Sequence, residues 1–304
     1  MFDILVAGEI NPDLILTGDV TPEFQQVEKL IESATLTVGS SSAIFACGAA
    51  RLGLKVAFIG VCGKDVFGRF MLEAMQARGV DVANVTIHPS GTTGLSVILD
   101  RSVDRAILTF PGLIPALRAS DIPNSLLQQA RHVHVASYFL QTNLRPGLPS
   151  LFQRAHSLGL TTSLDTNYDP SERWAGFDEL LSATDVFLPN QTEALSITRA
   201  GSIEAAAQHL AEKARFAVVK LGAAGALACE KGTITKADSI PVHVLDSVGA
   251  GDTFDAGFLL AFLDRWNMER SLRFACVCGA LSMRSLGGTL AQPTLEEALK
   301  YVSG

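Results

Sequence analysis

The chain has 304 residues, of which 48% are hydrophobic and 18% charged, and its formal net charge at pH 7 is -7. This composition supports one large or two modest folded domains and excludes general disorder. The acidic balance offers no basic footprint for nucleic acid, and charges interrupt every apolar run well short of a membrane span. With no basic segment after Met1, we expect a soluble, cytoplasmic protein with no nucleic-acid or membrane partner.

Short apolar segments rich in Val, Ile and Phe alternate with segments of helical periodicity along the chain. Strands are predicted at 4–7, 56–61, 133–136, 161–164, 185–188 and 217–221. Continuously apolar strands between helices are typical of a parallel sheet covered on both faces. The sequence therefore predicts an α/β protein, a three-layer α/β/α fold with a central, mostly parallel sheet.

Two regions break this alternation. Residues 13–18 with 33–38 read as strands, and residues 94–110 read as a β-hairpin with a short charged turn. Strands inserted without helices between them usually form a small separate sheet, which in an enzyme can close over a site as a lid. No repeat or long linker is visible, so we expect one domain over 1–304 with a β lid formed by about 13–38 and 94–110.

The segment from Asp246 to Leu263 carries the strongest chemical pattern. It is predicted to follow an apolar strand at 242–245 and to open a helix. Gly249, Ala250 and Gly251 can bend tightly and leave backbone N–H groups free at the helix N-terminus, where the helix dipole favours negative charge. The pattern predicts a cradle for a phosphate or an oxyanion.

Asp252 falls in the first turn of this predicted helix. It can act as a capping carboxylate, or as a general base that takes a proton from a hydroxyl attacking a bound phosphorus. Neither common phosphate motif is present, because the segment is neither G-x-x-x-x-G-K-[ST] nor the dinucleotide fingerprint G-x-G-x-x-G.

Five segments together carry a family resemblance. Gly249-Ala-Gly-Asp-Thr-Phe254, with Asp246 six residues before Asp252, resembles the C-terminal signature of the ribokinase (PfkB) family of carbohydrate and nucleoside kinases. The other four, in the family order, are Gly39–Gly53 with Gly63–Gly68, Asp165-Thr-Asn167 with Trp174, Asn190–Glu193, and Lys220–Gly225. The match spans nearly the whole chain, so coincidence is very improbable.

The resemblance implies a ribokinase-like fold and transfer of the γ-phosphoryl group of ATP to a hydroxyl of a sugar or nucleoside. It assigns Asp252 as the general base and the backbone of Gly249, Ala250 and Gly251 as the anion hole. Phosphoryl transfer depends mainly on positioning and charge neutralisation, so a base, a cradle and a metal suffice.

Cofactor ligands follow from the same resemblance. Asn190 and Glu193 match the motif that lies by the triphosphate and organises Mg²⁺ through water, although alone they read as a helix capping box. Lys220, Gly222 and Gly225 match the nucleotide-binding loop, although alone they read as a tight turn.

A second cation site is implied beside the anion hole. Asp246 and the carbonyls of Val248 and Gly287 fall where family members hold a monovalent cation such as K⁺.

On the substrate side, Asp13 matches a carboxylate that accepts hydrogen bonds from substrate hydroxyls, and Gly39 with Ser40 stands at the family's glycine pair. Arg105, in the hairpin, is expected to approach the substrate from the lid or to lie solvated on it. A lid sheet with an exposed face also suggests a homodimer formed through two lids.

One position departs from the family pattern. Ile44 stands where the family usually has an Asn that binds sugar hydroxyls, and an isoleucine can neither donate nor accept a hydrogen bond. The usual sugar contacts are therefore in question, and the serines at 40–42 are candidate replacements. Two alternatives stay open: a nucleoside kinase, and a catalytically idle sugar-binding regulatory homologue.

Overall fold

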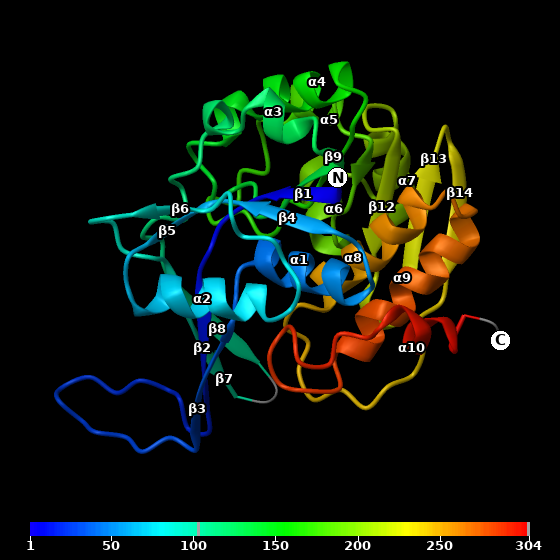
Figure 1. Cartoon of the computed structure of the whole chain (residues 1–304). Helices are drawn as coiled ribbons and strands as arrows, with labels where there is room; N and C mark the ends of the chain where they lie inside the picture. The colour runs from blue at the N-terminus through cyan, green and yellow to red at the C-terminus, as the bar shows by residue number, and fades with distance from the viewer. Residues whose placement is uncertain (102–103, 303–304) are drawn as a thin grey trace.

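The structure is a computed structural model that describes residues 1–101 and 104–302. Within these residues the larger sheet has eight strands, in the order β14-β13-β12-β11-β10-β9-β1-β4 (Figure 1). Their bounds are β1 (Phe2–Ala7), β4 (Val56–Ile59), β9 (Ala130–Val135), β10 (Thr161–Leu164), β11 (Val186–Phe187), β12 (Phe216–Lys220), β13 (Ala226–Glu230) and β14 (Thr233–Ala237). The strands from β4 to β12 run parallel, and β13 and β14 add an antiparallel edge, which confirms the predicted, mostly parallel sheet.

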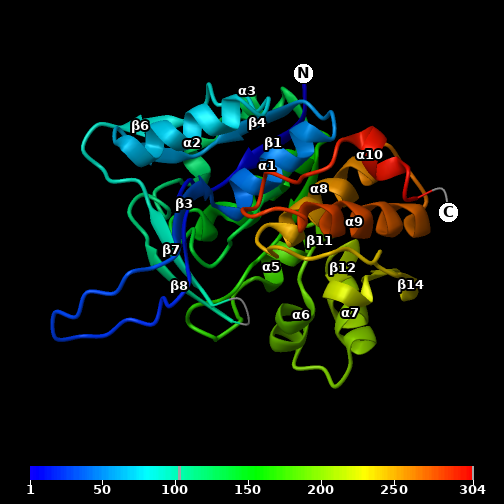
Figure 2. The same ribbon diagram turned by 90° about the horizontal axis from the view of Figure 1, so that it is seen from below.

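Helices cover both faces of this sheet (Figure 2). One face packs against α1 (Ser41–Arg51), α2 (Val66–Gln76), α8 (Ala250–Leu263), α9 (Met268–Ser282) and α10 (Leu295–Leu299). The other packs against α3 (Asn124–Leu127), α4 (Leu148–Ser157), α5 (Asp178–Leu181), α6 (Gln191–Thr198) and α7 (Ile203–Ala211). In β1, Ile4 and Val6 enter the core on the α1 and α8 face, and Leu5 and Ala7 enter the core on the α4 and α7 face. Because both faces are covered, the strand is apolar at successive positions.

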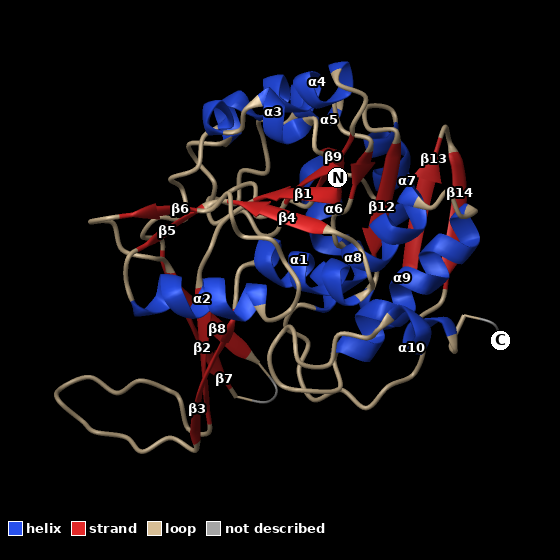
Figure 3. Cartoon of the chain, in the orientation of Figure 1, coloured by secondary structure: helices blue, strands red, loops and turns tan. Residues whose placement is uncertain are grey.

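The segments that break the alternation form a second sheet, in the order β3-β2-β7-β8, which stands apart from the larger one (Figure 3). Its strands are β2 (Pro12–Thr17), β3 (Ser33–Val38), β7 (Leu95–Asp100) and β8 (Arg105–Phe110), and β5 (Val61–Gly63) pairs with β6 (Thr86–His88) beside it. The predicted separate small sheet is confirmed. Residues 102–103 of the predicted hairpin turn lie outside the described residues.

The strand predicted at 242–245 is wrong, because this segment is a loop. Val244 and Leu245 are about half exposed, at 52% and 55%, so the apolar run does not enter a core. The backbone N–H groups of Leu245 and Asp246 both donate to the carbonyl of Met283, which ties the loop to the end of α9 instead of a sheet. Among the described residues, none of the helices has the length and apolar character needed to cross a membrane.

Candidate active site

Two predicted site residues, Asn190 and Lys220, lie where parallel strands end, together with two further acidic residues, Glu9 and Asp165. Strand β1 leads to Glu9, β10 to Asp165, β11 to Asn190, and β12 ends at Lys220. Carboxyl ends of parallel strands share one edge of a sheet, where open α/β sheets bind their ligands. The N-terminus of α8 lies at this edge too, because Lys220 Nζ contacts Asp255 on α8 at 3.1 Å.

The backbone at the start of α8 fits an anion. Gly249 is the N-cap residue with φ +72°, and as a glycine it has no side chain to occupy the first turn. A methyl group placed on Gly249 would lie 2.8 Å from Cα of Gly288 and 2.8 Å from Cγ2 of Ile44. Only glycine therefore fits here. The Ala250 N–H donates to the Ser247 carbonyl at a long 3.3 Å, and N–H groups at a helix start have no partner within the helix, so this turn can receive an anion.

Asp252 lies buried in that first turn. Burial raises the pKa of its carboxyl well above the usual value, and the negative charges of Asp165 and Glu9 raise it further. The charge of Lys220 and a hydrogen bond from Ser41 act in the opposite direction. A buried carboxylate with a raised pKa next to an anion cradle has the environment of a general base rather than of a solvated cap.

A buried ionic cluster supports this region of α8. Lys220 Nζ lies 2.7 Å from Asp165 Oδ2 and 3.1 Å from Asp255 Oδ2. Sequence reasoning did not identify Asp255. Its position three residues after Asp252, on the same side of a helix, was the available signal.

Asn190 and Glu193 form the capping box that their spacing predicts, at the start of α6. Asn190 Oδ1 accepts from the Glu193 N–H at 3.0 Å, and Glu193 Oε2 accepts from the Asn190 N–H at 2.9 Å. Burial and the charge of Asp165 raise the pKa of Glu193 to about 7, although Lys220 and the Asn190 N–H lower it.

The loop after β12 turns as its glycines predict. The N–H of Leu221 donates to the carbonyl of Gly225 at 2.9 Å, and Gly222 opens a short 3-10 turn whose residues are exposed. The loop thus exposes its backbone to solvent. Asn190 lies beside it, because Asn190 forms a parallel β-bridge with Lys220.

Asp246 joins two loops next to the anion cradle. Its Oδ1 accepts from the Val248 N–H at 2.9 Å, and its Oδ2 accepts from the Gly287 N–H at 2.8 Å. The three residues predicted for a monovalent cation are therefore neighbours.

The lid side of the site centres on Asp13 in β2. Asn11 Nδ2 lies 3.5 Å from Asp13 Oδ1 and donates to Ser96 of β7 at 3.3 Å. A methyl group on Gly39 would lie 2.2 Å from Asp13 Oδ1, so glycine is required there for the carboxylate to approach. Burial raises the pKa of Asp13 to about 7, Arg105 lowers it, and Asp246 and Glu9 raise it.

Ser40 serves a local role that the sequence did not reveal. Its hydroxyl donates to the Glu9 carbonyl at 2.7 Å and accepts from the Ala43 N–H, which caps α1. Glu9 is itself buried and accepts from Ser42 and Ser137 at 2.5 and 2.9 Å. Sequence reasoning missed Glu9, although it lies only two residues after the end of β1.

Ser41 is the serine of this group that faces the site. It hydrogen-bonds to Asp252, and it contacts the side-chain amide of Asn167, which also lies 3.2 Å from the Ser137 hydroxyl. Ile44, by contrast, is buried, and its side chain packs against Gly249 and Gly288. Ile44, which stands at the family's Asn position, therefore packs against the backbone of the proposed anion cradle instead of contacting a substrate.

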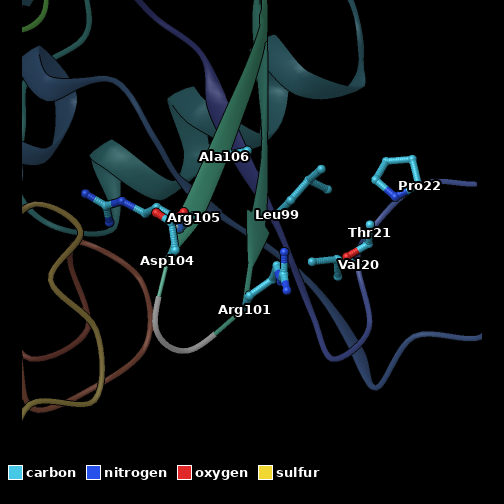
Figure 4. Close-up of a pocket in the computed structure, with 8 residues that line it drawn as sticks. All are labelled: Val20, Thr21, Pro22, Leu99, Arg101, Asp104, Arg105 and Ala106. Carbon is cyan, nitrogen blue, oxygen red and sulfur yellow. The ribbon is translucent and has the colours of Figure 1, made fainter.

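Arg105 lies at the edge of the lid. Figure 4 shows it with Asp104, Arg101, Leu99 and Ala106 around a small pocket against the loop after β2, and its side chain extends away from the Val20 to Pro22 side. Its positive charge acts on Asp13, so the two predicted substrate residues of the lid are electrostatic neighbours.

The residues present fit a nucleotide with Mg²⁺. Among the described residues no group of three or more His, Cys, Asp or Glu is arranged to hold a metal directly. Mg²⁺ in phosphoryl-transfer sites is usually held by one or two carboxylates, waters and substrate phosphates, for which Glu193 beside a phosphate cradle is suited.

Comparison with known families decides the class of this site. The model of the pfkB family of carbohydrate kinases matches residues 1–295. The chain belongs to this family. It is a carbohydrate kinase, and the predictions of a ribokinase-like fold and of ATP-dependent sugar phosphorylation are confirmed at this level.

Individual members of the family align along the whole chain. A ribokinase of Haemophilus influenzae is 27% identical over 311 residues, covering 98% of both chains. An ATP-dependent ribose-1-phosphate kinase of Halopiger xanaduensis is 31% identical over 310 residues, covering 100% of this chain and 99% of the other.

Solved structures of the family share the fold. A structure described as a putative ribokinase II from E. coli superposes with a TM-score of 0.88 at 22% identity, covering 100% of this chain and 99% of the other. Ribokinase of Arabidopsis thaliana, complexed with ribose and ATP, gives a TM-score of 0.88 at 24% identity with the same coverage.

Proposed function

We propose that this kinase transfers the γ-phosphoryl group of ATP to a hydroxyl of a small sugar or sugar-like substrate. Asp252 takes the proton of the attacking hydroxyl, and the backbone N–H groups of Gly249, Ala250 and Gly251 stabilise the charge that develops on the phosphoryl oxygens. The observation that carries the proposal is a buried carboxylate with a raised pKa in the first turn of a helix whose N-cap is a glycine.

The other ligands follow from their places around this centre. The loop Lys220 to Gly225 and Asn190 hold the nucleotide, and Glu193 orients Mg²⁺, which neutralises phosphate charge when bound. Asp246, with the carbonyls of Val248 and Gly287, holds a monovalent cation such as K⁺.

On the lid, Asp13 accepts from sugar hydroxyls beside Gly39 and Ser40, and Arg105 approaches the substrate. The chain is then one kinase domain whose β2-β3 and β7-β8 strands close over the sugar. A cytoplasmic location remains a prediction.

The lid also offers a surface for a second copy. Across its four strands, Leu36, Leu14, Val97 and Leu108 stand in register on one face, opposite to the face of Asp13, and Leu108 is 59% exposed. An apolar row of this kind on an exposed edge sheet favours pairing, so we infer a homodimer formed through two lids.

The function is tested by ADP release with Mg²⁺ and ATP on a panel of sugars, sugar phosphates and nucleosides. We expect turnover with a sugar or sugar phosphate and a 10²- to 10⁴-fold fall in kcat, as an order of magnitude, for Asp252→Asn with folding retained. The matched control is Asp264→Asn, at the exposed far end of α8. Sugar binding without turnover in the unmodified protein would instead support an idle homologue, and turnover with nucleosides alone would support a nucleoside kinase.

A further inference from the structure

The side chain of Lys220 belongs to a buried ionic cluster beneath α8, which nucleotide binding by the loop does not by itself explain. The side chains of Lys220, Asp165 and Asp255 are 12%, 3% and 1% exposed, so all three are withdrawn from water. Lys220 reaches them from the end of β12, Asp165 from the end of β10, and Asp255 from α8. The cluster thus ties two central strands to the helix that carries the anion cradle.

The place of Asp255 on α8 connects the cluster to the base. Asp252 and Asp255 are three residues apart, and side chains at this spacing share one side of a helix. A methyl group placed on Gly251 would lie 3.5 Å from Lys220 Nζ, so the ammonium group sits directly against the first turn. Holding Asp255 therefore fixes the rotation of α8 and the direction in which Asp252 points.

Charge within the cluster is close to balanced. Burial raises the pKa of Asp165, but the charge of Lys220 and hydrogen bonds from Asp255 and Asn167 lower it below its usual value. Burial raises the pKa of Asp255, Lys220 lowers it, and its contact with Asp165 raises it. The positive charge of Lys220 thus offsets the negative charge that Asp165 carries into the interior.

We propose that Lys220, held by Asp165 and Asp255, is a positioning residue that fixes the first turn of α8, and so orients Asp252, and places a cation directly against that turn. This proposal rests on the assignment of Asp252 as the general base. In the step itself the hydroxyl proton passes to the Asp252 carboxylate as the hydroxyl oxygen bonds to phosphorus and the bond to the leaving ADP oxygen breaks. Lys220 exchanges no proton.

Among the groups that act on Asp252, Lys220 supplies the positive charge. Asp165 after β10 and Glu9 after β1 contribute negative charge, and the Ser41 hydroxyl at the start of α1 donates a hydrogen bond. Lys220 contributes the positive charge. Loss of that charge makes Asp252 harder to ionise.

The test is the pH dependence of kcat/KM, whose acid limb reports the pKa of the base in the free enzyme. A base is active when unprotonated, so a raised pKa moves the acid limb to higher pH. In Lys220→Met we expect the midpoint to rise by about 1 unit, as for removal of a nearby opposite charge. At pH values below the midpoint, kcat/KM of the variant should be about tenfold lower than in the wild type, and at pH values above it kcat/KM should recover. Lys220→Gln, polar and of similar length, carries the same expectation if the methionine variant does not fold.

Two variants separate charge from structure. Lys220→Arg keeps the cation and should restore the wild-type midpoint. Asp255→Asn keeps the size of the side chain and leaves the Lys220 charge in place, so the midpoint should not rise even if kcat falls. Lys213→Met, a remote lysine paired with exposed Asp178, is the matched control for removal of a lysine charge.

A uniform loss of kcat/KM at all pH values in Lys220→Met and Lys220→Gln, with an unchanged midpoint, would overturn the proposal. So would an equal rise of the midpoint in Asp255→Asn. Undiminished activity of Asp252→Asn would instead remove the proposed function itself, so the two failures are distinguishable.

Discussion

Gly249→Ala tests the anion cradle at its most constrained position. Gly249 has φ +72°, and an alanine there carries a left-handed penalty of about 1–2 kcal/mol. The new methyl group would also lie 2.8 Å from Cα of Gly288, a backbone atom that cannot rotate away. Overpacking of this kind adds about 1–3 kcal/mol, so we expect a total loss of about 3 kcal/mol of unfolding free energy.

Two measurements follow from that estimate. At about 2–4 °C per kcal/mol, the melting temperature should fall by about 6–12 °C, as followed by circular dichroism. Displacement of an anion-hole N–H should also lower kcat by about 10²–10³-fold in the ADP-release assay. The two readouts are independent, because one reports the fold and the other the transition state.

Gly251→Ala is the stability control for this comparison. Gly251 lies inside α8 at negative φ, and its methyl group would meet nothing closer than Lys220 Nζ at 3.5 Å, an ordinary contact. Its melting temperature should stay the same or rise slightly, since alanine favours helix over glycine by about 1 kcal/mol. A Gly249→Ala protein that melts with the wild type and keeps kcat within about threefold would refute the reasoning.

Two further predictions concern the lid. Burial raises the pKa of Asp13 to about 7 in the folded protein, against about 4 in the unfolded chain. The cost of burying this carboxylate as an anion therefore appears as the pH rises from about 4 to about 7. Asp13→Asn should therefore raise the melting temperature at pH 8 but not at pH 3. It should also weaken sugar binding in calorimetry. Equal shifts of the melting temperature at both pH values would contradict the raised pKa. Leu108→Asp places a charge in the exposed apolar row and should convert the proposed dimer to a monomer in sedimentation velocity, with Asp264→Asn as a surface control. A dimer that persists in Leu108→Asp would place the interface elsewhere.

The sequence predicted the parts of the fold that depend on local pattern. Ile4 to Ala7 is apolar throughout because its residues enter two cores in turn, and such a run reads clearly as a central strand. The run Val242 to Leu245 has similar composition, yet it is a loop. The Leu245 N–H donates to the carbonyl of Met283, a partner far along the chain that composition does not reveal.

The local geometry of the proposed site was predictable where one segment carries it. Gly249 to Asp252 places a cradle and a carboxylate on one helix turn, and the capping box of Asn190 and Glu193 is likewise local. The partners of Lys220 come from β10 and α8, so the pairing depends on tertiary structure. The same holds for Ser40, whose hydroxyl is bound by Glu9 on another strand end.

The residues proposed to contact the substrate belong to two different parts of the fold. Asp13 is part of the small sheet, whereas Asp252 stands on a helix packed against the large one, and Glu9, between them, acts electrostatically on both. Water is a competing acceptor for any phosphoryl donor, and in the proposed reaction it needs Asp252 but not Asp13. A sugar bound by both residues, as proposed, would hold the small sheet against the site, so contact with Asp13 would favour transfer to the sugar over hydrolysis.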